Sequence, residues 1–279
     1  MEVKNGHTFK KSVLLAEFLG TAGISLAVNM SNGDVNIPLV IFFMIMLTGG
    51  ISGGHLNPAI TLGVYIAQKE LGKNGIYAMG IVIAQVLGAL AALPVGYMLR
   101  VSYFDEHGHE NLEPGINSFA PPILVNTDGK PAYGQVMLAE VIGGFFVIMS
   151  VLYAKREIGN GADSVLWVGL IGIAFYVSSD LFKGVSGGFV NPATALAQNV
   201  WQNITVKMDP NHEWAMWTFE YTICYLLGPL IGGFVGGTVF NFTNEMQLDM
   251  EEHGEEDEDV DLAASMKRKN TTETLDNDN

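Results

Sequence analysis

Charged side chains are scarce in this sequence, at 15% of its 279 residues. Soluble domains carry roughly 25%, and apolar runs of about 20 residues, the length that crosses a bilayer, recur along the chain. These two features exclude an ordinary soluble domain. They predict an integral membrane protein whose chain passes through the lipid bilayer several times.

Cysteine is nearly absent as well. The single residue, Cys224, excludes an intrachain disulfide and lies in an apolar run, where a lone thiol behaves as a small hydrophobe. The sequence also lacks a glycine-rich phosphate loop ending in Gly-Lys-Ser/Thr, and it shows no zinc-ligand spacing. It therefore predicts no metal site, no cofactor, no enzymatic activity and no nucleic-acid partner.

The negative charge is concentrated at one end. From residue 244 onward, 13 acidic and three basic side chains carry −10 of the net charge of −15, which leaves −5 for the rest of the chain. A charged segment with so few apolar residues is typical of disorder. Residues 244–279 are therefore expected to form an acidic, disordered, cytoplasmic tail.

Six apolar segments predict transmembrane helices in two groups of three. They are expected at about 12–30, 37–51, 75–99, 134–154, 164–182 and 214–240. Repeat one thus covers about 12–99, repeat two covers about 134–241, a polar linker loop over 100–133 joins them, and residues 1–11 precede the first span. Because three is an odd number, repeat two enters the membrane with opposite polarity, which makes an inverted repeat.

One short string occurs in both repeats. Residues 52–59 read Ser-Gly-Gly-His-Leu-Asn-Pro-Ala, and residues 186–193 read Ser-Gly-Gly-Phe-Val-Asn-Pro-Ala. Asparagine is a favoured helix N-cap, and proline suits the first helical turn. Each copy therefore predicts a loop followed by a short helix, over about 58–67 and 192–201. The residues at these helix starts are Asn57, Pro58, Ala59, Asn191, Pro192 and Ala193.

A ten-residue helix is about 15 Å long, half of the roughly 30 Å hydrocarbon core. Two such re-entrant helices from opposite faces would meet near the midplane, each with roughly +0.5 charge at its N-terminus. The loops before them need a water-filled cavity or protein around them. We therefore predict a polar track that opposes cations, lined by loop residues Gly54, His55 and Gly187. His55 would either line the track and respond to pH or form a local hydrogen bond.

The six spans, the two matched strings and the Ala-Glu pairs at 16–17 and 139–140 resemble the aquaporin family of major intrinsic proteins. The resemblance implies an all-α membrane protein with six transmembrane helices and two re-entrant half-helices, in a channel domain over 12–243. It also implies a homotetramer with one pore per subunit, which passes water and small neutral solutes. In aquaporins, the positive ends of the half-helices likewise exclude cations.

The residue after the second motif departs from the family pattern. Family members usually have arginine there, whereas this chain has Thr194. By resemblance, the other outer-constriction positions are Ile37, Ser179 and Gly188, none of them aromatic or charged. This set predicts a pore that passes glycerol or urea besides water. Lys183 is either a substitute cation at the outer mouth or a surface lysine.

Two carboxylates, Glu17 and Glu140, lie within predicted spans. The resemblance favours a structural role in which each accepts hydrogen bonds from the adjacent re-entrant loop. A proton relay in an ion-coupled secondary transporter is the alternative, since buried membrane carboxylates often serve transport. A structural membrane protein with a closed pore is the third possibility.

Basic residues predict the orientation of the chain. Ten of the 14 Lys and Arg residues fall on one side if both termini are cytoplasmic, and loops rich in these residues usually stay in the cytoplasm. We therefore expect a multi-pass protein with both termini in the cytoplasm, in the plasma membrane or an intracellular membrane.

Overall fold

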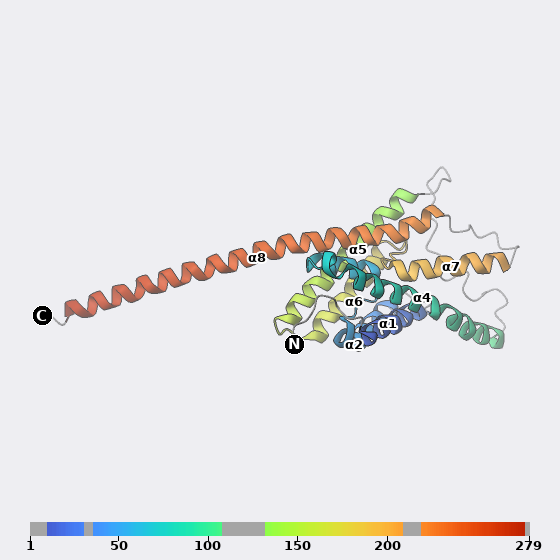
Figure 1. The fold of residues 1–279 in the computed structure, drawn as a ribbon, viewed down its shortest axis with the longest axis horizontal. Coiled ribbons are helices and arrows are strands. Elements are labelled where there is room, and N and C mark those ends of the chain that lie inside the picture. Colours follow the sequence, from blue (N-terminus) through green and yellow to red (C-terminus); the bar gives the residue numbers. More distant parts are fainter. Residues whose placement is uncertain (1–9, 31–35, 108–131, 209–218, 277–279) are drawn as a thin grey trace. The chain divides into compact units, whose positions relative to one another are not determined.

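The computed structural model describes residues 10–30, 36–107, 132–208 and 219–276, and its regular elements there are all helices (Figure 1). In chain order they are α1 (Lys11–Met30), α2 (Asn36–Ser52), α3 (Pro58–Ala67), α4 (Leu71–His107), α5 (Tyr133–Gly159), α6 (Ser164–Leu181), α7 (Pro192–Met208) and α8 (Phe219–Asp276). Most of the predicted N-terminal segment 1–11 and of the linker loop 100–133 lies outside the described residues.

Five of these helices are long and apolar enough to cross a membrane, namely α1, α4, α5, α6 and α8. The remaining predicted span is α2, whose 17 residues reach about 26 Å at 1.5 Å per residue. Its buried side chains include Ile41 and Ile45, whereas Leu39, Phe43 and Leu47 are exposed. An apolar exposed face of this kind suits contact with lipid or with another membrane-embedded helix.

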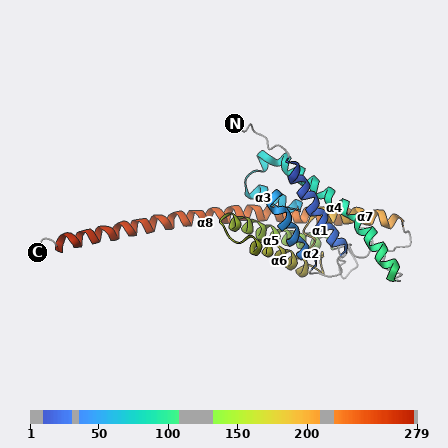
Figure 2. The same cartoon turned by 90° about the horizontal axis from the view of Figure 1, so that it is seen from below.

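The two short helices join the two repeats. Within the compact unit that ends at Thr238, α1 packs against α2 and α4, and α5 packs against α6; Figures 1 and 2 both place these neighbours side by side. Helix α3 of the first repeat contacts α5 and α7 of the second, and α7 contacts α1 and α4 of the first. Each half-helix therefore contacts helices of the opposite half of the chain.

Two glycines allow equivalent close approaches in the two repeats. A Cβ on Gly88 of α4 would lie 2.2 Å from the carbonyl oxygen of Phe18 in α1, and a Cβ on Gly232 of α8 would lie 2.3 Å from that of Val141 in α5. Phe18 and Val141 directly follow Glu17 and Glu140. Small residues let membrane helices pack closely, and here they bring a neighbouring helix against the turn that carries each buried glutamate.

Four helix ends differ from expectation. Helix α4 continues past the predicted end at 99 to His107, into the predicted linker loop, α5 continues past 154 to Gly159, and α7 continues past 201 to Met208. The tail over 244–279, expected to be disordered, continues α8 as a helix to Asp276. These segments contain no proline inside the added turns, and the tail is rich in the helix formers Glu, Met, Leu and Ala. Local helix propensity, which the compositional argument ignored, accounts for the difference.

Candidate functional site

The two motif asparagines cap the short helices as their positions predict. The Oδ1 atom of Asn57 accepts a hydrogen bond from the backbone N–H of Ala59 at 2.8 Å, and that of Asn191 accepts from Ala193 at 3.1 Å. Helix α3 spans the predicted 58–67, and α7 begins at the predicted Pro192. Capping and the proline ring therefore set both helix starts.

The same asparagines also link the two loops. The Nδ2 atom of Asn57 donates to the carbonyl oxygen of Val190 at 2.8 Å, and that of Asn191 donates to the carbonyl oxygen of Leu56 at 3.1 Å. Each amide group thus reaches the loop of the opposite repeat, so the two helix N-termini meet at one place. An amide nitrogen carries two hydrogens, so each asparagine retains a second N–H for another acceptor.

The residue before each asparagine has a left-handed backbone. Leu56 has φ 51° and Val190 has φ 43°. Positive φ values are uncommon for residues other than glycine, and they are least favourable for β-branched residues such as valine. Such a conformation costs on the order of 1–3 kcal/mol and persists only where the surroundings enforce it. The equivalent strain in both loops indicates that the surrounding contacts hold them in this shape.

Those contacts come from the two buried glutamates. Glu17 accepts the backbone N–H groups of His55 at 3.0 Å and Leu56 at 2.7 Å. Glu140 accepts those of Phe189 at 3.0 Å and Val190 at 2.7 Å. Each carboxylate therefore satisfies two loop donors at membrane depth, where an unsatisfied N–H is costly. This geometry is the one expected for the structural role of both residues.

Further polar side chains, which belong to neither repeated motif, support the loops. Gln85 donates from Nε2 to Glu17 at 2.7 Å and to the Thr61 hydroxyl at 3.0 Å. In the second repeat, the Tyr225 hydroxyl donates to the carbonyl oxygen of Ser186 at 2.7 Å. Gln85 could have been identified from the sequence, because a polar residue in the middle of an apolar span usually has a structural or functional role.

The four predicted constriction residues line one cavity. Ile37, Ser179, Gly188 and Thr194 surround a space of about 70 Å³ beside Asn191, which exceeds the roughly 10–15 Å³ that a single water needs. The hydroxyl of Thr194 donates to the carbonyl oxygen of Asn191, and that of Ser179 donates to Gly188. Both hydroxyls thus donate their hydrogen to a backbone carbonyl, and their oxygen atoms can still accept a hydrogen bond from a solute.

The rest of this cavity, which we call the Thr194 cavity, is mainly apolar. Its other lining residues are Ile24, Val28, Pro38, Ile41, Phe175, Gly187 and Phe189, together with Asn191. The two phenylalanines were not predicted, because the resemblance gave only four positions. The described residues place no charged side chain in its wall, and Lys183 is exposed and absent from it.

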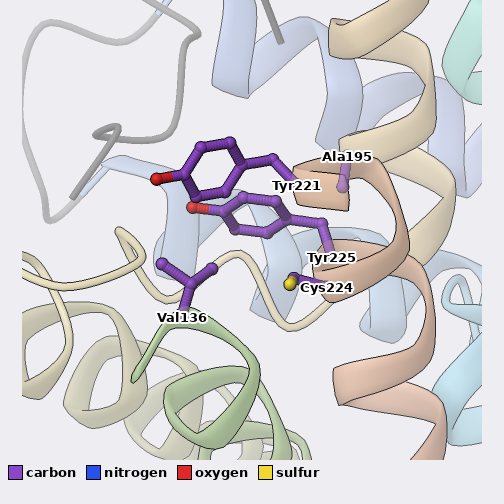
Figure 3. Close-up of a cluster of buried hydrophobic side chains, with 5 residues drawn as sticks. All are labelled: Val136, Ala195, Tyr221, Cys224 and Tyr225. Atoms are coloured by element: carbon purple, nitrogen blue, oxygen red, sulfur yellow. The ribbon is translucent and has the colours of Figure 1, made fainter. Parts of the chain in front are cut away.

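A buried aromatic cluster holds one wall of the Thr194 cavity. Figure 3 shows the rings of Tyr221 and Tyr225 extending in the same direction from α8, with Ala195 and Val136 on either side. Phe189 packs against this cluster, with its ring 5.7 Å from that of Tyr225 at an angle of 70°. Aromatic pairs prefer edge-to-face contact, so the cluster helps to orient the Phe189 ring at the cavity wall. Cys224 belongs to the same cluster as a buried free thiol.

The first loop has different neighbours. Gly54 folds back along α2, where its Cβ would lie 3.3 Å from the Cα atom of Gly49. His55 is only 5% exposed, and its Nε2 atom lies 3.4 Å from the Nζ atom of Lys155. Of the three predicted lining residues of the loops, Gly187 borders the Thr194 cavity, whereas Gly54 and His55 do not.

Apolar helices of bilayer length, two half-helices and their paired asparagines define a polytopic membrane protein built on an inverted repeat. The family described as Major intrinsic protein has a sequence model that matches residues 7–240. The chain therefore belongs to the major intrinsic protein family. This result confirms the resemblance drawn from the two motifs.

Individual relatives agree with this assignment. The chain is 30% identical to "Probable aquaporin PIP2-2" of Oryza sativa subsp. japonica over 206 residues, which are 73% of this chain and 62% of the relative. It is 30% identical to "Aquaporin PIP2-1" of Arabidopsis thaliana over 207 residues, with the same shares of 73% and 62%. The matched part of the chain thus spans less than two thirds of the length of these relatives.

One solved structure has the same fold. The "X-ray structure of the aquaglyceroporin from Plasmodium falciparum" superposes with a TM-score of 0.64 at 18% identity, covering 86% of this chain and 98% of that chain. At this identity the likeness speaks for the fold. It confirms the predicted fold class of six membrane helices and two re-entrant half-helices.

Proposed function

We propose that this protein is a passive channel for water and small uncharged solutes such as glycerol and urea, with one pore in each subunit. The observation that carries the proposal is the reciprocal bonding of the two loops, in which Asn57 donates to the carbonyl of Val190 and Asn191 to that of Leu56, so that two helix N-termini meet beside the Thr194 cavity. Two positive helix ends and amide donors favour neutral hydrogen-bonding molecules over cations. The family membership and the names of the relatives support the same function.

The composition of the Thr194 cavity supports passage of solutes larger than water. Ile37, Phe175 and Phe189 offer apolar surface, while Ser179 and Thr194 offer hydroxyl oxygens. Glycerol and urea combine polar groups with a hydrophobic face or edge, so they match a wall of this kind. No arginine occupies position 194 to narrow the space.

The same proposal includes the assembly and the orientation. Major intrinsic proteins form tetramers with a pore in each subunit. We propose that this chain likewise forms a homotetramer. The distribution of lysine and arginine supports placing both termini in the cytoplasm. The membrane concerned is the plasma membrane or an intracellular membrane.

The function is tested by stopped-flow light scattering on purified protein in liposomes. Water, glycerol, urea and ammonia permeabilities are measured on one preparation and compared with protein-free liposomes. The proposal expects raised permeability to water, glycerol and urea. Water permeability alone would contradict the wide pore, a saturable flux that depends on an ion gradient would indicate a coupled transporter, and no permeability at all would indicate a closed structural protein.

A further inference from the structure

Lys155 and the Thr194 cavity lie on opposite sides of the paired asparagines. Ile37, at the start of α2, lines the Thr194 cavity, whereas the loop that carries His55 leaves the other end of α2 after Ser52. A helix rises 1.5 Å per residue, so these two ends are roughly 23 Å apart. Helix α5 repeats the pattern, with Val136 near its start in the aromatic cluster and Lys155 near its end.

The ammonium group of Lys155 is directed at the first re-entrant loop. Its Nζ atom lies 3.4 Å from Nε2 of His55 and 3.0 Å from the position that a Cβ on Gly53 would take. The side chain is half-buried. A snorkelling lysine extends its ammonium toward water, whereas this one is turned to the loop that precedes Asn57.

The charge of Lys155 has no carboxylate partner among the residues that the structure describes. The next residue offers a contrast, because Arg156 forms an ion pair with Glu157 at 2.7 Å and lies over the ring of Tyr153 at 4.8 Å. The nearest influence of opposite charge is Glu17, which acts on Lys155 through space while its carboxylate oxygens accept the backbone N–H groups of the same loop. A partly buried charge in a low-dielectric site acts strongly on other ions that approach it.

The contact with Lys155 determines which nitrogen of the His55 ring carries the hydrogen. An ammonium group can only donate, so Nε2 of His55 accepts and the neutral ring carries its hydrogen on Nδ1; the tautomer is inferred from this partner. Within the described part of the chain, Nδ1 of this buried ring has no hydrogen-bond partner. A buried N–H with no protein acceptor calls for an oxygen from a water or a solute.

We propose that Lys155 is the fixed cation that excludes positively charged solutes from this pore, at the mouth opposite the Thr194 cavity. The inference rests on the proposed channel function, since it concerns what that channel rejects. It explains how a pore with threonine at position 194 can still discriminate by charge: repulsion acts at the Lys155 mouth, in addition to the two helix N-termini.

The test compares urea with guanidinium, which are similar in shape but differ in charge. Influx of both, together with water permeability, is measured in liposomes containing wild-type protein, Lys155→Met, Lys155→Arg or the control Arg156→Met. We expect Lys155→Met to raise guanidinium influx about tenfold relative to wild type, equivalent to about 1.4 kcal/mol. Urea and water permeability should stay within about twofold, and Lys155→Arg and Arg156→Met should behave as wild type.

Several results would overturn the inference. Unchanged guanidinium influx in Lys155→Met, with urea and water flux intact, would contradict it and leave the channel function standing. An equal rise in Arg156→Met would show that any lost charge has this effect. Lys155→Gln is the second variant if Lys155→Met does not reach the membrane, with the same expected result. Absence of urea and water flux in wild type would instead contradict the proposed function itself.

Discussion

The two re-entrant loops have the same backbone but opposite surroundings. Both loops carry glycines with positive φ, and both place a left-handed residue before the asparagine, Leu56 in one and Val190 in the other. At the equivalent position two residues before the asparagine, however, the first loop has His55 beside Lys155, and the second has Phe189 against Tyr225. The repeat therefore fixes the backbone, while one variable position and its neighbour give each mouth its chemistry.

This comparison separates two kinds of selectivity. The Thr194 cavity is mainly apolar and has no charged side chain in its described wall, so it suits discrimination by size and shape. The His55 side presents a cation and a ring nitrogen that has no partner among the described residues, so it suits discrimination by charge. Changes to the shared backbone should affect stability in both repeats, whereas changes to the variable positions should affect permeation at one mouth.

The largest expected effect comes from the two buried glutamates. Glu17→Gln and Glu140→Gln each replace a carboxylate oxygen with an N–H donor that faces loop N–H groups. We expect each to lower the free energy of unfolding by roughly 2–4 kcal/mol, since hydrogen bonds to charged groups are strong and orphaned donors are costly. The two losses should be similar, because each glutamate also has a side-chain hydrogen-bond partner, Gln85 for Glu17 and Ser186 for Glu140.

The measurement is reversible unfolding in mixed detergent micelles, followed by tryptophan fluorescence. Glu157→Gln is the matched control, because its carboxylate forms only a partly exposed pair with Arg156 and should contribute about 0–1 kcal/mol. Losses in Glu17→Gln and Glu140→Gln no larger than in this control would show that the glutamates do not hold the loops.

The glycines that bring helices against the glutamate turns should have the next largest effect. Gly88→Ala and Gly232→Ala each place a Cβ within 2.3 Å of a backbone oxygen that cannot move aside cheaply. We expect each to cost about 1–3 kcal/mol, the range for overpacked sites. Gly169→Ala, where a Cβ would meet nothing within 4 Å, is the control and should be close to neutral in the same unfolding measurement. A cost in only one repeat would break the proposed equivalence of the two helix pairs.

The smallest effect belongs to a hydrogen bond of the second repeat. Tyr225→Phe removes the hydroxyl that donates to the carbonyl oxygen of Ser186 but keeps the ring against Phe189. We expect a loss of about 1 kcal/mol, as for a typical hydrogen bond. Tyr97→Phe, at an exposed ring, should leave the unfolding midpoint unchanged. An equal shift in both variants would indicate that the Tyr225 hydroxyl is not specifically used.

Local signals predicted the framework well. Asparagine followed by proline specifies a helix start from neighbouring residues alone, and α3 over Pro58–Ala67 and the start of α7 follow directly. Apolar length predicted the membrane helices for the same reason, because spanning depends on composition rather than on partners. The left-handed shape of Leu56 and Val190 was not predicted, because it depends on glutamates that lie about 40–50 residues away.

The chemistry at the two mouths depends on packing between distant segments. Lys155 follows the predicted end of the span at 154, whereas in the structure it lies in the last turns of α5 and reaches a loop 100 residues earlier in the chain. Phe175 in α6 and Phe189 in the second re-entrant loop were missed because nothing local marks an aromatic residue that borders a cavity. Both contacts follow from how the repeats fit together, which periodicity does not encode.

Glycerol permeability of Thr194→Arg compared with wild type tests the central claim most directly, with water permeability measured on the same liposomes. Thr194 is 2% exposed and borders a space of about 70 Å³, so an arginine there must occupy much of the room that glycerol needs. The account predicts glycerol permeability in wild type and a reduction of about tenfold in the variant, about 1.4 kcal/mol, with water permeability largely kept. Unchanged glycerol permeability in a folded, membrane-inserted Thr194→Arg protein would contradict the account.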